Sequence, residues 1–192
     1  MQNVLGLCYD LDTQEKGRNK MGMDVYGKKP TNEVGEYFRR NVWGWRPLWQ
    51  YVEDNHSEIA ALVEYAQSND GDGLNETKSK LLSRLLREDL ASGKAQAYID
   101  ARNKYLASLP LEACDLCDGT GIRTDEVGIS NGMPERELSP EVAIATGRTK
   151  GYCNGCSGEG TKVAWDTHYS VDLEDLEEFA DFLESCGGFE IC

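Results

Sequence analysis

The chain has 192 residues, of which 40% are hydrophobic and 28% are charged, and its formal net charge is −14 at pH 7. This composition is typical of a soluble globular chain with one domain and at most a small appendage, and it excludes wholesale disorder. No stretch approaches the ~20 consecutive apolar residues of a transmembrane helix, so no membrane span is expected.

Residues 1–20 are predicted to form a flexible N-terminal extension. The opening MQNVLGLCYD lacks the basic residues and the long apolar core of a secretory signal. The rest of the segment is polar and lysine-bearing, as in poorly ordered tails. We therefore expect a cytoplasmic protein, in which seven cysteines indicate metal binding rather than disulfides.

Aromatic residues gather in the segment 21–52, and six of them fall within fifteen positions: Tyr37, Phe38, Trp43, Trp45, Trp49 and Tyr51. Glycine and proline interrupt this segment, so we expect a loop that enters a helix near Pro47, a favourable first-turn residue. Most of these rings are expected to be core, with Trp43 and Trp49 buried and Trp45 more exposed. The alternative is a binding surface for single-stranded nucleic acid or protein, with three arginines beside the rings: Arg39, Arg40 and Arg46.

Three helices are expected between residues 55 and 110. The first, over 55–69, places four apolar side chains on one face: Ile59, Leu62, Val63 and Ala66. A loop over 69–76 then leads into a helix that ends at Gly93, and the third helix is stopped by Pro110. The two histidines, His56 and His168, are expected to be surface or cap residues.

The sequence Cys-x-x-Cys-x-Gly-x-Gly occurs twice, as CDLCDGTG at 114–121 and as CNGCSGEG at 153–160. Each pair of cysteines can supply two thiolates from one tight turn, so the two pairs predict one tetrahedral Zn²⁺ site. Its four ligands are Cys114, Cys117, Cys153 and Cys156. With all four positions taken by protein, the zinc is predicted to be structural rather than catalytic.

The glycines of this motif permit positive φ angles, so the backbone can curl around the metal and direct N–H groups at sulfur. Residues 121–127 and 161–165 are expected to continue the turns as short strands that pair into a finger. Residues 128–150 would form a loop or small insertion at the tip of the finger.

Residues 170–188 are predicted to form an amphipathic helix, with Ser170 or Asp172 as the N-cap. Its apolar stripe is expected to face the core: Val171, Leu173, Leu176, Phe179, Ala180 and Leu183. The terminal FEIC is expected to be a short strand or a docked tail. Residues 166–192 carry nine acids and no Lys or Arg, which suits either a solvated face or a basic protein partner.

The repeated cysteine motif resembles the zinc-binding, cysteine-rich region of DnaJ-type co-chaperones. In that family four copies make two zinc sites and contribute to binding unfolded or partner polypeptides. Two copies imply one site here. The chain lacks the family's His-Pro-Asp tripeptide, so the resemblance implies a zinc hairpin without a co-chaperone activity.

Several segments together resemble a group of small proteins encoded by bacteriophages and bacterial genomes: MGMDVYG, YFRRNVWGWRPLW, NDGDGL, the cysteine pairs and the terminal CGGFEIC. The resemblance runs from Met21 onward and implies no catalytic residues. Because similar proteins begin at MGMDVYG, it also implies that residues 1–20 are an extension or an upstream start.

The expected fold is α+β and mostly α, with a compact helical body that carries an inserted zinc-stabilised β-hairpin finger. The body would comprise residues 21–110, the finger 111–165, and an acidic C-terminal helix and tail, 166–192, would pack back on the body. No phosphate-binding, dinucleotide-binding or serine-hydrolase motif occurs, which favours a non-enzymatic protein-interaction module with a basic protein partner. The alternatives are a nucleic-acid accessory protein using the finger and the Trp/Arg cluster, and an enzyme of unknown type.

Overall fold

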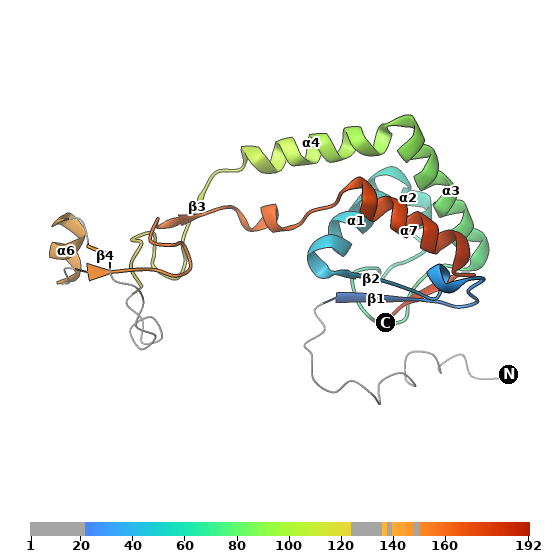
Figure 1. Ribbon diagram of the computed structural model, residues 1–192, viewed down its shortest axis with the longest axis horizontal. Coiled ribbons are helices and arrows are strands. Elements are labelled where there is room, and N and C mark those ends of the chain that lie inside the picture. The colour runs from blue at the N-terminus through green and yellow to red at the C-terminus, as the bar shows by residue number, and fades with distance from the viewer. Residues whose placement is uncertain (1–21, 124–135, 138–139, 148–149) are drawn as a thin grey trace, which may run out of the picture. The chain divides into compact units, whose positions relative to one another are not determined.

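The computed structural model describes residues 22–123, 136–137, 140–147 and 150–192 (Figure 1). The chain divides into two compact units, the first built from residues up to 103 together with 168–192, and the second from 104–167. The described residues form helices and small antiparallel sheets, and the prediction of a mostly helical α+β fold is confirmed. The extension predicted for residues 1–20 lies outside the described residues.

A three-stranded antiparallel sheet lies in the first unit, in the order β2-β1-β7. Its strands are β1 (Gly22–Gly27), β2 (Tyr37–Asn41) and β7 (Phe189–Ile191), and a 3-10 helix, η1 (Glu33–Gly35), connects β1 to β2. Val25 in the central strand is opposite both Phe38 and Ile191. The strand expected at the C-terminus is therefore confirmed, and it pairs with the first strand described.

Helix α1 (Val42–Asn55) begins five residues before the predicted start at Pro47. The helix starts at Val42 because the side chain of Asn41 caps it by accepting a hydrogen bond from the N–H of Gly44. Pro47 therefore lies in the second turn, where its missing N–H leaves the carbonyl of Trp43 without its i→i−4 hydrogen bond.

This earlier start sets which tryptophans face the core. Trp45 and Trp49 are fully buried, four residues apart on one helix face, and their rings stack with centroids 5.7 Å apart. Trp43 is half-buried. The prediction was thus correct for Trp49 and wrong for the other two, because it placed Trp45 rather than Trp43 on the more exposed face.

The prediction of a helix over residues 55–69 is wrong, since α2 (Ser57–Ala60) is a single turn. Val63 and Ala66 are nevertheless buried, in turns that follow α2. The backbone there has tertiary partners in place of helical ones. The indole Nε1 of Trp45 donates to the carbonyl of Ala66 over 2.8 Å, and the N–H of Tyr65 donates to the carboxylate of Asp72.

The next two helices follow the prediction closely. Helix α3 (Glu76–Ser92) is capped by the Asn75 side chain and ends at Gly93, whose φ of 79° is left-handed. Helix α4 (Lys94–Ser108) follows it directly and ends before Pro110. It begins in the first unit and ends in the second.

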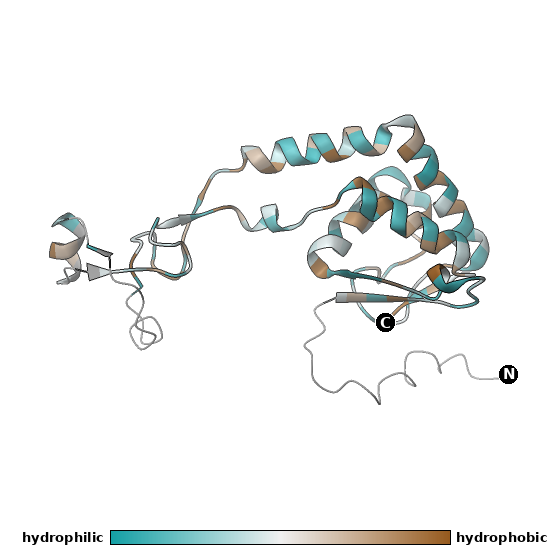
Figure 2. Ribbon diagram, viewed as in Figure 1, coloured by the Kyte–Doolittle hydropathy of each residue, from teal (hydrophilic) through white to brown (hydrophobic). Residues whose placement is uncertain are grey.

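Helix α7 (Leu173–Ser185) closes the first unit and has Asp172 as its N-cap, in a capping box with Asp175. Figure 2 shows hydrophobic and hydrophilic residues alternating around it. All six residues of the expected apolar stripe are buried or packed against the core. The stripe lies against α3, where the Ser83 hydroxyl donates to the carbonyl of Ala180.

The second unit contains two short antiparallel ribbons. One pairs β3 (Glu112–Ala113) with β6 (Thr161–Lys162), and the other pairs β4 (Arg136–Glu137) with β5 (Lys150–Gly151). Between β4 and β5 lies helix α6 (Pro140–Thr146), and η2 (Trp165–His168) follows β6. No helix among the described residues combines the length and the apolar character needed to cross a bilayer.

The predicted pairing of 121–127 with 161–165 is wrong for the residues that are described. Thr161–Lys162 is a strand, but its partner precedes the first cysteine pair instead of following it. Residues 121–123 form no strand, and 124–127 lie outside the described residues. Of the predicted tip, 128–150, only 136–137, 140–147 and 150 are described, and they include the helical turns of α6.

Candidate metal centre

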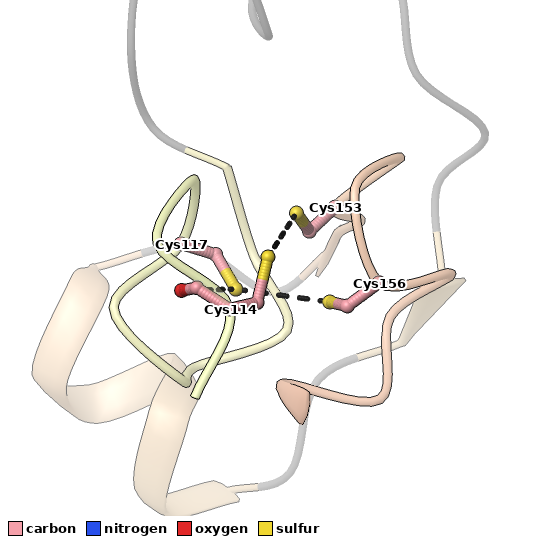
Figure 3. A group of neighbouring side chains, drawn as sticks. All are labelled: Cys114, Cys117, Cys153 and Cys156. Atoms are coloured by element: carbon pink, nitrogen blue, oxygen red, sulfur yellow. Dashed lines mark hydrogen bonds between the residues drawn. The ribbon is translucent and has the colours of Figure 1, made fainter. Parts of the chain in front are cut away.

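The four cysteines of the repeated motif lie together in the second unit (Figure 3). Their Sγ atoms are all within 4.8 Å of one another, and all four side chains are buried. Two contacts join the two motifs, since the Sγ of Cys114 is 3.8 Å from that of Cys153 and the Sγ of Cys117 is 3.8 Å from that of Cys156. The predicted ligand set is thus brought to one point by two turns that are 39 residues apart.

The spacing of these sulfurs fits a tetrahedral zinc ion. With Zn–S bonds of about 2.3 Å, a regular tetrahedron places its sulfurs about 3.8 Å apart. The two contacts between the motifs have this length, whereas a disulfide would need an S–S distance of about 2.05 Å. Four buried cysteines are therefore placed to bind one metal ion, with no fifth described ligand in the group.

Each motif folds into the same turn, which we call the first knuckle (114–121) and the second knuckle (153–160). The last glycine of each donates its backbone N–H to the second cysteine, Gly121 to Cys117 over 3.2 Å and Gly160 to Cys156 over 3.1 Å. Such N–H···S bonds stabilise thiolate charge and orient the ligands. The expected role of the motif glycines is confirmed in these two bonds.

The knuckles curl because three of the last four residues in each have left-handed backbone. Asp118 and Ser157, between the second cysteine and the first glycine, have φ of 51° and 53°. The four motif glycines have φ between 75° and 82°. Glycine adopts this conformation without steric cost, whereas aspartate and serine do so at a modest cost that the surrounding hydrogen bonds offset.

The knuckles also touch through their glycines, in a reciprocal way. A Cβ atom built on Gly121 would collide with the carbonyl of Gly158, and one built on Gly160 would collide with the carbonyl of Gly119. The second glycine of each motif is therefore required twice, for its backbone angle and for its missing side chain. This reciprocity makes the two knuckles two-fold-like halves of one centre.

Two backbone bonds join the flanks of the knuckles. The N–H of Cys114 donates to the carbonyl of Gly160 over 2.8 Å, and the N–H of Arg123 donates to the carbonyl of Tyr152 over 3.3 Å. Beside them, Lys162 donates to the carboxylate of Asp115 across the β3–β6 ribbon, which leaves one acid of the finger neutralised.

The pKa values of the cysteine thiols are shifted in different directions. Burial raises the pKa of Cys153 to about 12. Burial opposes ionisation of Cys156 as well, but the N–H of Gly160 and the thiols of Cys153 and Cys117 lower its pKa on balance. Metal binding therefore has to displace protons from the cluster, and acid has to release the metal.

Other residues singled out in the sequence lie outside this centre, in the first unit. The three arginines of the aromatic segment are engaged by side chains of the same chain. Arg39 is 3.4 Å from Asp24, Arg46 donates to the hydroxyl of Tyr169, and Arg40 pairs with both Asp175 and Glu178 of α7. The acidic face of α7 is thus partly neutralised, the more so because Arg87 of α3 pairs with Asp181 and Glu184.

The two histidines differ in their surroundings. His168 is exposed near Trp43, with ring centroids 6.2 Å apart, as expected of a surface residue. His56 is a cap residue by position, between α1 and α2, but its side chain is only 7% exposed and its Nε2 lies 2.8 Å from the carboxylate of Asp89. The prediction that His56 is a surface or cap residue is therefore confirmed in its second alternative, with the side chain packed against Asp89.

The cluster around Asp89 was not predicted from the sequence. Its carboxylate, on α3, also accepts hydrogen bonds from the hydroxyl of Tyr51 and from the ammonium of Lys94. Although burial opposes ionisation, the bonds from Tyr51, Lys94 and His56 hold the pKa of Asp89 below its ordinary value. The sequence contains one signal for this cluster. Asp89 follows Leu82 and Leu86 at helical spacing, so a charged residue lies on the apolar face of the predicted helix.

Comparisons of the chain with protein-family models, with curated proteins and with solved structures gave no match. The reading of the site therefore depends on its own geometry and chemistry.

Proposed function

We propose that this chain is a non-enzymatic protein-interaction module whose second unit is held together by one structural zinc ion. The observation that carries the proposal is the closed four-sulfur centre of Cys114, Cys117, Cys153 and Cys156. Such a centre offers no open coordination position for water or substrate, so it supports a structural role and not metal catalysis.

Exposed apolar side chains support protein binding. Among the described residues, six of the ten large hydrophobic side chains that are exposed belong to the second unit: Tyr105, Leu111, Leu116, Ile144, Val163 and Trp165. Continuing the β3–β6 register by one residue places Leu111 opposite Val163, so two of them share one face of the ribbon. Exposed apolar groups gathered on a small rigid unit are typical of protein-interaction surfaces.

Charge supports a partner with a basic surface. The chain has a net charge of −14, and acids on α7 outnumber the two arginines that pair with them. The engagement of Arg39, Arg40 and Arg46 within the chain favours a protein partner over nucleic acid, because phosphate binding needs accessible cations.

The resemblance to small proteins of bacteriophages and bacterial genomes supports a specific setting. In this proposal the chain is encoded by a phage or mobile element and works in the host cytoplasm. There it binds a host or phage protein, as an acidic inhibitor that occupies a basic surface. A basic groove on a nucleic-acid enzyme is the kind of surface that such an anionic protein would fit.

A pair of matched valines tests the proposal. Val163 in the second unit is 50% exposed, and Val34 in the first unit is 53% exposed. Zinc-loaded full-length chain is used to capture partners from host lysate, alongside Val163→Asp and Val34→Asp. A partner that is retained by the wild type and by Val34→Asp but lost by Val163→Asp is the expected result, with zinc content equal in all three.

Two results would contradict the proposal. One is equal retention of every captured protein by Val163→Asp. The other is binding to single-stranded DNA or RNA with an affinity that falls steeply with salt concentration, because that slope counts phosphate contacts.

A further inference from the structure

The first unit contains a cavity of about 360 Å³ at the junction of α1 and α2, closed on one side by α3. Its walls differ in character. Ile59, Leu81 and Leu85 make an apolar wall, while His56, Glu58 and Lys78 supply titratable groups. Protein cavities of this size that combine an apolar wall with a few polar groups are typical of small-molecule sites.

His56 is held rigidly at this cavity. Its Nε2 bonds to the Asp89 carboxylate, which is itself fixed by Tyr51 and Lys94. Because that carboxylate is ionised and accepts the bond, Nε2 carries the proton. The arrangement orients the imidazole, as a carboxylate does for a functional histidine.

The other ring nitrogen, Nδ1, has different surroundings from Nε2. It has no hydrogen-bond partner among the described residues. It is also not one of the fully buried side-chain atoms that lack a partner, so it is not completely buried. Nδ1 therefore keeps contact with open space, although the side chain is 7% exposed.

Lys78 provides a cationic group on the same cavity. It is half-buried, and its ammonium makes no hydrogen bond or ion pair in the part of the chain that the structure describes. The neighbouring lysine on α3, Lys80, is by contrast exposed and paired with Glu76 at 2.6 Å. Lys78 is thus the lysine of this helix whose charge is available to a ligand in the cavity.

We propose that the cavity binds a small organic monocarboxylate. Its carboxylate pairs with the ammonium of Lys78, its apolar part lies against Ile59, Leu81 and Leu85, and the ring of His56 lies beside it as another lining group of the cavity. Glu58 and Asp89, which are both negative, disfavour a multiply charged anion such as phosphate. This site lies in the first unit and does not depend on the protein-interaction function proposed for the second.

Imidazole NMR of the zinc-loaded full chain tests the proposal, because the chain has two histidines and His168 serves as an internal reference. The probes are acetate, 4-methylpentanoate and inorganic phosphate. We expect 4-methylpentanoate to shift the ring resonances of His56 and not those of His168. Acetate, which lacks the apolar part, should bind about tenfold more weakly or worse.

Variants of the two lysines complete the experiment. Lys78→Met should weaken 4-methylpentanoate binding about tenfold, while the matched Lys80→Met should leave it unchanged. Neither lysine packs in the core, so both variants keep the fold. The proposal is overturned if His56 does not shift with the carboxylates, if Lys78→Met binds as well as Lys80→Met, or if phosphate binds more tightly than 4-methylpentanoate.

Discussion

Gly121 faces the backbone carbonyl of Gly158 so closely that no methyl group fits between the two knuckles. Both residues have left-handed φ angles, 75° and 82°, and Gly121 also donates its N–H to the sulfur of Cys117. Packing, backbone angle and metal-ligand orientation therefore meet at one position. A substitution there should be felt directly by the bound metal.

We expect Gly121→Ala to weaken zinc binding by about tenfold or more, because the new methyl group pushes the knuckles apart and strains a positive φ. Gly147→Ala is the matched control, since Gly147 has φ of 66° in the same unit but open space around its Cβ position. Competition with a chromophoric chelator measures both affinities. Equal affinities would show that contact between the knuckles does not matter.

Metal analysis should find one zinc per chain, and the double variant Cys117→Ser, Cys156→Ser should lose it. Cys186→Ser is the control, because Cys186 is a buried cysteine outside the cluster. Full zinc content in the double variant would exclude these ligands.

Chelation should unfold the second unit and leave the helices of the first unit intact, because the four-cysteine cluster is separate from the main hydrophobic core. Far-UV circular dichroism, which reports mainly on α1, α3, α4 and α7, should change little. A loss of most of the helical signal on chelation would show that the first unit depends on the metal.

The stability of the first unit should depend on acid through Asp89. The pKa of this carboxyl is lower in the folded state than in the unfolded chain, where it is about 3.9. Its contribution is therefore present above that unfolded value and is lost as the pH falls through the folded value. We expect Asp89→Asn to lower the free energy of unfolding at pH 7 and to flatten its decline below pH ~4, as measured by urea denaturation.

Asp54→Asn provides the comparison for this titration, because Asp54 accepts a bond from Tyr98 at an exposed position. It should change the acid limb much less than Asp89→Asn. Parallel stability curves for wild type and Asp89→Asn would contradict the assignment.

Trp45→Ala should cost about 3–5 kcal/mol of unfolding free energy, since it empties a fully buried site and orphans the carbonyl of Ala66. Trp43→Ala should cost clearly less, because Trp43 is half-buried against Tyr169. The two are measured by chemical denaturation, or by soluble yield if Trp45→Ala does not fold. Equal losses would mean that the two rings are equally important to the core.

The sequence predictions were accurate where a feature depends on residues that are close together in the sequence. The cysteine pairs of the candidate metal site and the ends of α3 and α7 depend on residues within a few positions of one another, such as Asn75, Gly93 and Asp172. These features were predictable because caps and cysteine pairs are local.

Features that depend on distant partners were not predictable in the same way. The chain after α2 stays out of a helix because Trp45 and Asp72 take up its backbone groups. The partner of β6 precedes the first knuckle, and the pair of His56 and Asp89 joins residues 33 positions apart. Neither the periodicity of hydrophobic residues nor the spacing of motifs in the sequence indicates such long-range contacts.

The first unit is assembled from two separated stretches of chain, whereas the second unit is one continuous stretch between them. Strand β7 pairs with β1 and, on its other side, bonds to residues 71–74, so a strand that follows the second unit in the sequence completes the sheet. During synthesis on the ribosome, all four cysteines therefore emerge before α7 and β7 are available. We expect the finger to acquire its metal cotranslationally, while the N-terminal half stays incompletely folded, exposed to chaperones and proteases, until α7 and β7 have been synthesised.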